Sequence, residues 1–185
     1  NQEIAQLVAA LGAEDPRARA DASAHLDEHG LAAVPWLFAG AEDSDPERAQ
    51  ASREVLGRFR KRTWATTPPT DEEFDARLQR SVKPGHPLRV FAFWWVARIA
   101  RVEEARRTIP DPSPWLKDDD PEVRRYAAVL HIRFGIDVRR LADVLPDALE
   151  QILRSRGELE EWEEVLISLC AATFEEAELV QVRMD

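Results

Sequence analysis

The segment His25-Leu26-Asp27-Glu28-His29 carries residue types that can bind a metal and activate water. Its spacing is that of the inverted zinc-peptidase motif, in which both imidazoles lie on one helix face and the glutamate acts as a base. A third ligand would come from downstream, where Glu103 and Glu104 are available. However, the segment also falls in the last helical turn before Gly30, where a histidine favours the helix dipole. We therefore interpret it as structural and expect no metal site, no cofactor and no catalytic residue.

A second group of residues indicates binding rather than catalysis. In the stretch 87–104, Phe91, Trp94 and Arg98 are spaced so that they share one side of a helix. Aromatic and arginine side chains together are typical interface anchors. A helix that is apolar all round is instead typical of a buried element. In that case the insertion 61–84 or a later helix would cover Phe91 and Trp94.

Arginines recur at one position of the repeated units described below. Three of them lie thirteen residues after the residue that begins their unit: Arg58, Arg98 and Arg133. On successive helices these side chains would form a ladder of cations, with Tyr126 at the position that Phe91 holds one unit earlier. The sequence thus predicts a binding surface made of the following residues: Phe91, Trp94, Arg98, Tyr126, Arg133 and Arg58.

Repeated Asp-Pro units would position this surface. Three stretches align without gaps, at 15–22, 45–52 and 120–127. In each, we expect Asp to cap a helix whose first residue is Pro, where the missing donor costs nothing. A small residue seven places after each Asp lets a neighbouring helix approach. A degenerate unit fits at 85–99, after a helix that would begin with Thr70 as cap and Glu73 completing a capping box.

The pattern predicts an all-α protein, because no alternating strand pattern is present. Helices are expected near 2–12, 16–29, 31–41, 46–60, 70–82, 87–104, 121–134, 137–155 and 158–182. They would form a single domain over 1–185, with clear repeats at 2–60 and 114–135, a degenerate repeat at 70–104 and acidic C-terminal capping helices at 137–185.

Two of these units resemble the HEAT-repeat family. The resemblance rests on Asp15, Arg19, Ala22, Leu26 and Gly30 in one unit and on Asp120, Val123, Arg124, Ala127 and Gly135 in another. The unit at 45–56 departs from it, with Ala49 where the family has arginine. The resemblance implies a right-handed α-solenoid of about four to five helix pairs, whose second helices line a concave face. Such arrays usually bind other macromolecules along that face.

Composition restricts the range of partners. The 185 residues include 25 basic and 35 acidic ones, for a net charge of −10, which argues against nucleic acid as a partner. Seven glycines are few for a phosphate-binding loop, and no small-molecule ligand is expected. The most apolar run is shorter than the roughly 20 residues that cross a membrane. The single cysteine, Cys170, excludes an intramolecular disulfide, so we expect a cytoplasmic protein.

The sequence leaves three functional hypotheses. The first is a non-enzymatic protein-interaction module that binds a protein partner on the concave face of its second helices. The second is an acidic neutralising partner of a basic protein, similar to an immunity protein, because residues 158–185 contain nine acidic residues and one basic residue. The third is a nucleic-acid enzyme or bilin lyase subunit on a HEAT-like scaffold. The chain begins without Met, so we also expect a trimmed or excised part of a longer protein.

Overall fold

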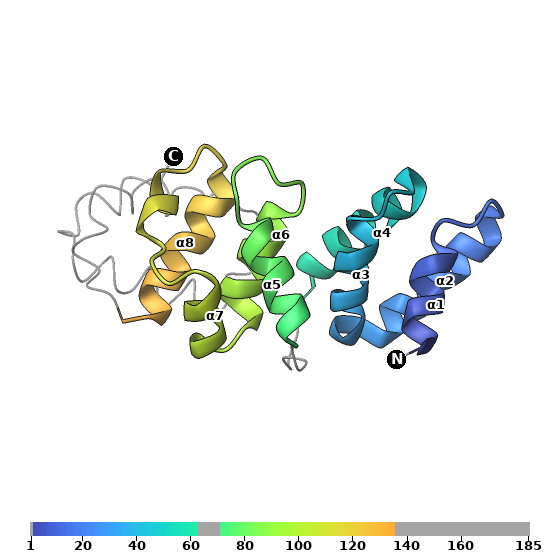
Figure 1. The fold of residues 1–185 in the computed structure, drawn as a ribbon, viewed down its shortest axis with the longest axis horizontal. Helices are drawn as coiled ribbons and strands as arrows, with labels where there is room; N and C mark the ends of the chain where they lie inside the picture. Colours follow the sequence, from blue (N-terminus) through green and yellow to red (C-terminus); the bar gives the residue numbers. More distant parts are fainter. Residues whose placement is uncertain (1, 63–70, 136–185) are drawn as a thin grey trace, which may run out of the picture. The chain divides into compact units, whose positions relative to one another are not determined.

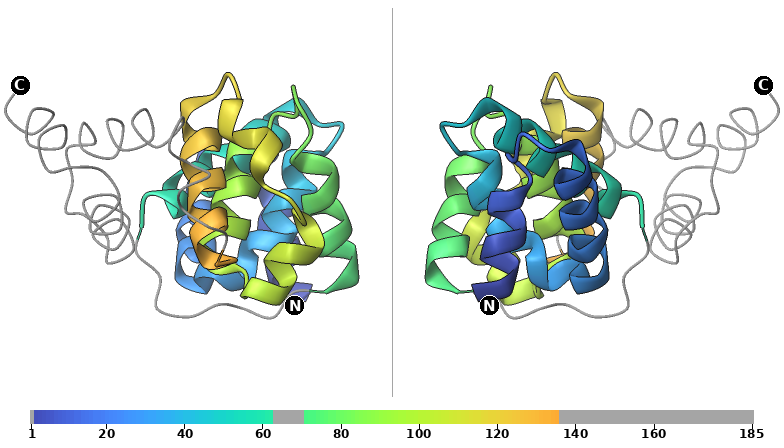
Figure 2. Two further views of the ribbon diagram at one scale, coloured as in Figure 1. Left: turned by 90° about the vertical axis from the view of Figure 1, so that its left-hand side faces the viewer. Right: turned by 90° about the vertical axis from the view of Figure 1, so that its right-hand side faces the viewer.

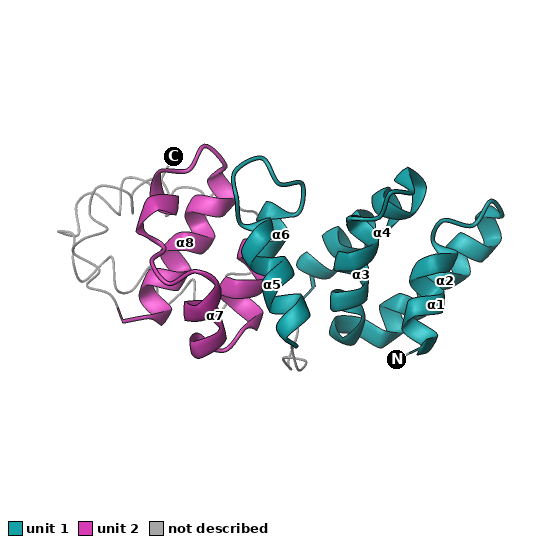
Figure 3. Cartoon of the chain, viewed as in Figure 1, with its two compact units in different colours: residues 1–92 teal, residues 93–185 magenta. Residues whose placement is uncertain are grey.

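The computed structural model describes residues 2–62 and 71–135. Every regular element in these two ranges is helical, and no strand occurs in them (Figure 1). The all-α prediction is therefore confirmed for the described part of the chain. The chain divides into two compact units, residues 1–92 and 93–185 (Figure 3).

The first unit is built from helix pairs. Its elements are α1 (Gln2–Ala10), α2 (Pro16–His29), a 3₁₀ turn (Gly30–Ala33), α3 (Val34–Ala41), α4 (Pro46–Arg60) and α5 (Glu72–Ser81). Each pair packs on itself, α1 with α2 and α3 with α4. The pairs then pack on each other like on like, so that α1 lies beside α3 and α2 lies beside α4 (Figures 1 and 2). The first helices thus form one layer and the second helices another.

The Asp-Pro starts behave as the sequence predicts. The carboxylates of Asp15, Asp45 and Asp120 each accept a hydrogen bond from the backbone N–H two residues later, at 2.9, 3.0 and 2.9 Å. The three Asp residues have extended backbones, and proline occupies the first turn of each helix. These contacts satisfy donors that the helix itself leaves unpaired.

The unit at 45–56 compensates for the arginine that it lacks. In the two units that have it, Arg19 and Arg124 donate to backbone carbonyls of the loop before their helix. In the unit with Ala49, Arg48 instead donates to the Asp43 carboxylate at 2.8 Å. The pKa of Asp43 is lowered by the backbone N–H of Asp45 and by Arg48. The loop is therefore held by an ion pair in place of a hydrogen bond to the backbone.

Small residues allow close approach in the first unit. A Cβ atom added to Gly40 on α3 would lie 2.6 Å from Oγ of Ser52 on α4 and 2.7 Å from Cγ1 of Val8 on α1. Ser52 and Val8 are both buried. Ser52 is the small residue that the repeat predicts seven places after Asp45, and its helix does approach a neighbour closely at this point.

The second unit contains shorter elements. The division falls within α6 (Arg89–Trp94), which continues into a π-helical turn (Trp95–Ile99). The elements that follow are α7 (Val102–Thr108), a 3₁₀ turn (Ser113–Lys117) and α8 (Pro121–Arg133). Gly135 follows α8 with a positive φ of 66°, as expected for a glycine that ends a helix.

The continuous helix predicted at 87–104 is wrong. Ala100 has an extended backbone, with ψ at 144°, and it separates the π-helical turn from α7. The carboxylate of Glu104 accepts a hydrogen bond from the backbone N–H of Arg101 at 3.1 Å, and α7 begins there. The sequence conceals this start, because arginine is not among the residues that usually cap a helix.

The predicted start of the fifth helix is shifted by one residue. Asp71 caps α5, and its carboxylate accepts a hydrogen bond from the backbone N–H of Phe74 at 2.8 Å. Thr70, the predicted cap, lies outside the described residues, as do the helices predicted at 137–155 and 158–182, the acidic segment and Cys170. Among the helices of the described ranges, none has both the length and the apolar character to cross a membrane.

Candidate functional site

The aromatic residues predicted as anchors are buried. Phe91, Trp94 and Tyr126 retain 7%, 1% and 3% of their surface. The ring of Phe91 lies 5.4 Å from that of Phe38, and the ring of Trp94 lies 6.3 Å from that of Trp95. These aromatics belong to the core, as expected of a helix that is apolar all round. The prediction that they offer an accessible binding surface is therefore wrong.

Two arginines of the predicted ladder link helices instead. Arg58 on α4 donates to Oγ of Ser23 at 2.6 Å and lies 3.5 Å from Oδ1 of Asp27, both on α2. Arg133 on α8 donates to the backbone carbonyl of Ala97 at 2.8 Å. Asp27 and Ala97 hold equivalent positions in the repeats that begin at residues 15 and 85, since each lies twelve residues after the start of its repeat. The recurrence seen in the sequence is thus a repeated contact between second helices.

Arg98 and Arg133 of the ladder are partly buried, so their charges are less exposed to solvent than a surface ladder would require. Burial lowers the pKa of the Arg98 guanidinium, and its interaction with the Tyr126 hydroxyl opposes that shift only in part. Burial likewise lowers the pKa of Arg133. Arg58 has 42% of its side chain exposed, and it forms an ion pair with Asp27. The arginines of the predicted ladder therefore act mainly in contacts between helices.

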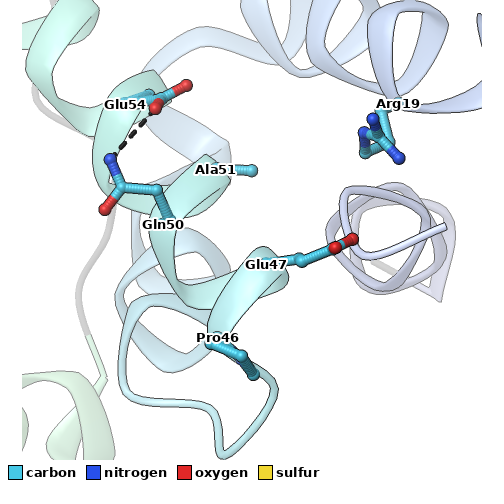
Figure 4. A pocket seen from close by; sticks show the side chains of 6 residues that line it. All are labelled: Arg19, Pro46, Glu47, Gln50, Ala51 and Glu54. Atoms are coloured by element: carbon cyan, nitrogen blue, oxygen red, sulfur yellow. Dashed lines mark hydrogen bonds between the residues drawn. The ribbon is translucent and has the colours of Figure 1, made fainter. Parts of the chain in front are cut away.

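An open groove lies on the second helices of the first unit. It has a volume of about 370 Å³ and runs between α2 and α4 (Figure 4). Its lining residues are Arg19, Pro46, Glu47, Gln50, Ala51 and Glu54. The layer of second helices is where the repeat pattern predicts binding, although none of the six predicted residues lines this groove.

The wall formed by α4 is acidic. Glu47, Gln50 and Glu54 are exposed and lie three and four residues apart, so they share one side of the helix. Nε2 of Gln50 donates to Oε1 of Glu54 at 3.0 Å. Both glutamates are exposed, and neither forms an ion pair within the described residues.

On the α2 side, the residue that lines the groove is Arg19. Its guanidinium donates to the carbonyls of Ala13 at 2.6 Å and Glu14 at 3.0 Å. Figure 4 shows Glu47 extending from α4 toward the side on which Arg19 lies. Because Arg19 is bound to the preceding loop, the groove combines a fixed cationic edge with two exposed carboxylates.

The sequence contains a signal for this groove that the aromatic pattern concealed. The polar stripe Glu47, Gln50 and Glu54 recurs at helical spacing on the α4 side that faces away from its apolar residues. Charged stripes of this kind are common on solvated helices, so periodicity alone does not distinguish a groove from an ordinary surface. Only the position of α2 beside α4 makes the distinction.

The zinc-peptidase spacing does not assemble a metal centre in the described part of the chain. His25 is exposed, and Nε2 of His29 lies 3.8 Å from Oε1 of Glu3, which is on α1. No group of three or more His, Cys, Asp or Glu side chains in the described residues lies close enough to hold a metal ion.

Comparison with known proteins provides no family assignment. The chain matches no protein-family model, and no curated protein is similar to it in sequence.

Proposed function

We propose that this chain is a HEAT-like α-solenoid that binds a protein partner along its second helices without catalysing a reaction. Two observations support the solenoid: the like-on-like packing of helix pairs in the first unit, and the arginine contact that recurs between second helices in both units. The right-handed arrangement of about four to five helix pairs that the sequence predicts is part of this proposal.

The observation that carries the binding function is the groove between α2 and α4. It is open to solvent, it joins two successive second helices, and its available side chains are polar. Glu47 and Glu54 lie seven residues apart, which corresponds to about 10 Å along a helix. The partner we propose is a protein segment with two Lys or Arg side chains at that separation.

The test reverses the charge of the groove and compares it with a matched control. Glu47→Lys/Glu54→Lys changes two exposed carboxylates that line the groove. Asp21→Lys/Glu28→Lys makes the same change in net charge, also at exposed positions seven residues apart, but on α2 and outside the groove. Both double variants and the wild type would be used to capture partners from a native lysate at low and high salt.

A partner retained by the wild type and the α2 variant, but lost by the groove variant, would support the proposal. Retention should weaken as salt screens the ion pairs. If both variants lose the partner equally, binding follows overall charge, and the groove is not the site. That result would favour the acidic neutralising hypothesis, whose segment 158–185 lies outside the described residues.

A further inference from the structure

Ser113 and His131 form a hydrogen-bonded pair in the second unit. Ser113 begins the 3₁₀ turn and is exposed, whereas His131 lies on α8 and retains 2% of its surface. Oγ of Ser113 lies 3.2 Å from Nε2 of His131. The other ring nitrogen, Nδ1, lies 3.1 Å from the backbone carbonyl oxygen of Ala127. The imidazole therefore lies between the hydroxyl of an exposed serine and a backbone carbonyl of its own helix.

The protonation state of the ring follows from these contacts. A carbonyl oxygen can only accept a hydrogen bond, so Nδ1 must carry a hydrogen. In the neutral ring, Nε2 then presents its lone pair to Oγ of Ser113. Burial lowers the pKa of His131, which keeps the ring neutral near pH 7. A serine beside a neutral base that a third group orients is the arrangement of an activated nucleophile.

Asp111 is the charged group beside this pair. Its Oδ1 accepts a hydrogen bond from the backbone N–H of Ser113 at 2.9 Å. Its carboxylate is also an acceptor for the Ser113 hydroxyl, whose single hydrogen can be donated either to Asp111 or to Nε2 of His131. These two contacts lower the pKa of Asp111, so it remains ionised. Its negative charge favours the protonated form of His131 and would stabilise the imidazolium that forms when the ring takes a proton.

We propose that Ser113 is a nucleophilic site that accepts an acyl group from an activated acyl ester, with His131 as its general base. Oγ attacks the carbonyl carbon while its proton passes to Nε2 of His131. The bond between that carbon and the leaving oxygen breaks, and the leaving oxygen takes the proton from Nε2. One alcohol is released and one acyl-serine is formed per chain, with no further reactant.

This proposal is independent of the groove, because Ser113 and His131 belong to the other unit. The reaction is stoichiometric, so it is compatible with a module that does not turn over a substrate. Failure of one proposal leaves the other unaffected.

The test uses p-nitrophenyl acetate as the probe on the full chain. Site-resolved mass spectrometry would follow acetylation of Ser113 and of Ser44, an exposed serine in the loop before α4 that serves as the control in the same sample. We expect Ser113 to react roughly 100-fold faster, which is the lower range for general-base assistance. Ser113→Ala should abolish the fast release of p-nitrophenolate. Equal rates at Ser113 and Ser44 would overturn the proposal.

Two further measurements examine the role of His131. His131→Asn should slow acetylation of Ser113 roughly 100-fold while leaving Ser44 unchanged. Because this change at a buried position could disturb folding, the wild-type pH profile provides a second test. The Ser113 rate should reach a plateau above about pH 6.5, where the ring is neutral. A rate that keeps rising in proportion to hydroxide, with no plateau, would show that His131 is not the base.

Discussion

The close approach of three helices at Gly40 predicts that Gly40→Ala destabilises the first unit. The added Cβ would lie 2.6 Å from Oγ of Ser52 and 2.7 Å from Cγ1 of Val8. Ser52 and Val8 are buried on different helices, so neither can move into solvent. Overpacking of this kind typically costs about 1–3 kcal/mol. The two short contacts place Gly40 near the upper end of that range.

The net effect is smaller than the overpacking cost, because alanine favours a helix over glycine by about 1 kcal/mol. A cost of about 3 kcal/mol less this gain leaves a destabilisation of about 2 kcal/mol. For a protein of this size, that corresponds to a drop in Tm of roughly 4–8 °C. Thermal unfolding followed by circular dichroism would measure it.

Gly57→Ala is the matched control for this prediction. Gly57 lies within α4, and a Cβ atom added there would have no neighbour within 4 Å. The same substitution should therefore stabilise the protein by up to about 1 kcal/mol. If Gly40→Ala proves as stable as Gly57→Ala, the close approach of α1, α3 and α4 does not exist as described, and the packing argument is refuted.

Two further predictions concern the arginines and the buried histidine. Arg133→Met should cost about 1–3 kcal/mol of unfolding free energy, because it removes a hydrogen bond from a charged group to the carbonyl of buried Ala97. Arg58→Met should cost less than about 1 kcal/mol, since its ion pair with Asp27 is partly exposed. Equal losses in urea unfolding would contradict this distinction. Because the pKa of His131 is lowered in the folded protein, the unfolded chain binds a proton more readily. The contribution of His131 to the free energy of unfolding is therefore fully present above about pH 6.5 and decreases as the pH falls below that value. His131→Gln should reduce that dependence, and an unchanged slope would exclude His131 as its source.

The local features of the fold could be predicted from the sequence. Asp15, Asp45 and Asp120 cap helices because an aspartate and the N–H groups two or three residues later are close in any chain that turns into a helix. The proline that follows and the glycine that ends a unit act over similarly short distances. These signals identified the starts of α2, α4 and α8 and the repeat that relates them.

Accessibility and contact partners required the tertiary structure. The spacing of Phe91 and Trp94 indicates a shared helix side, but only packing against other elements decides whether that side is covered. Arg58 reaches a partner 31 residues away, and Arg133 reaches one 36 residues away. Periodicity showed that the arginines recur, and it could not show that they link helices rather than face solvent.

The proposed sites depend on tertiary structure for the same reason. Glu47 and Glu54 form an ordinary polar stripe until α2 is placed beside α4, which makes them one wall of a groove. Ser113 and His131 are 18 residues apart on different elements, and no motif joins them. Hydrogen bonds between near neighbours are determined by the order of the residues, whereas contacts between distant residues depend on how the helices pack.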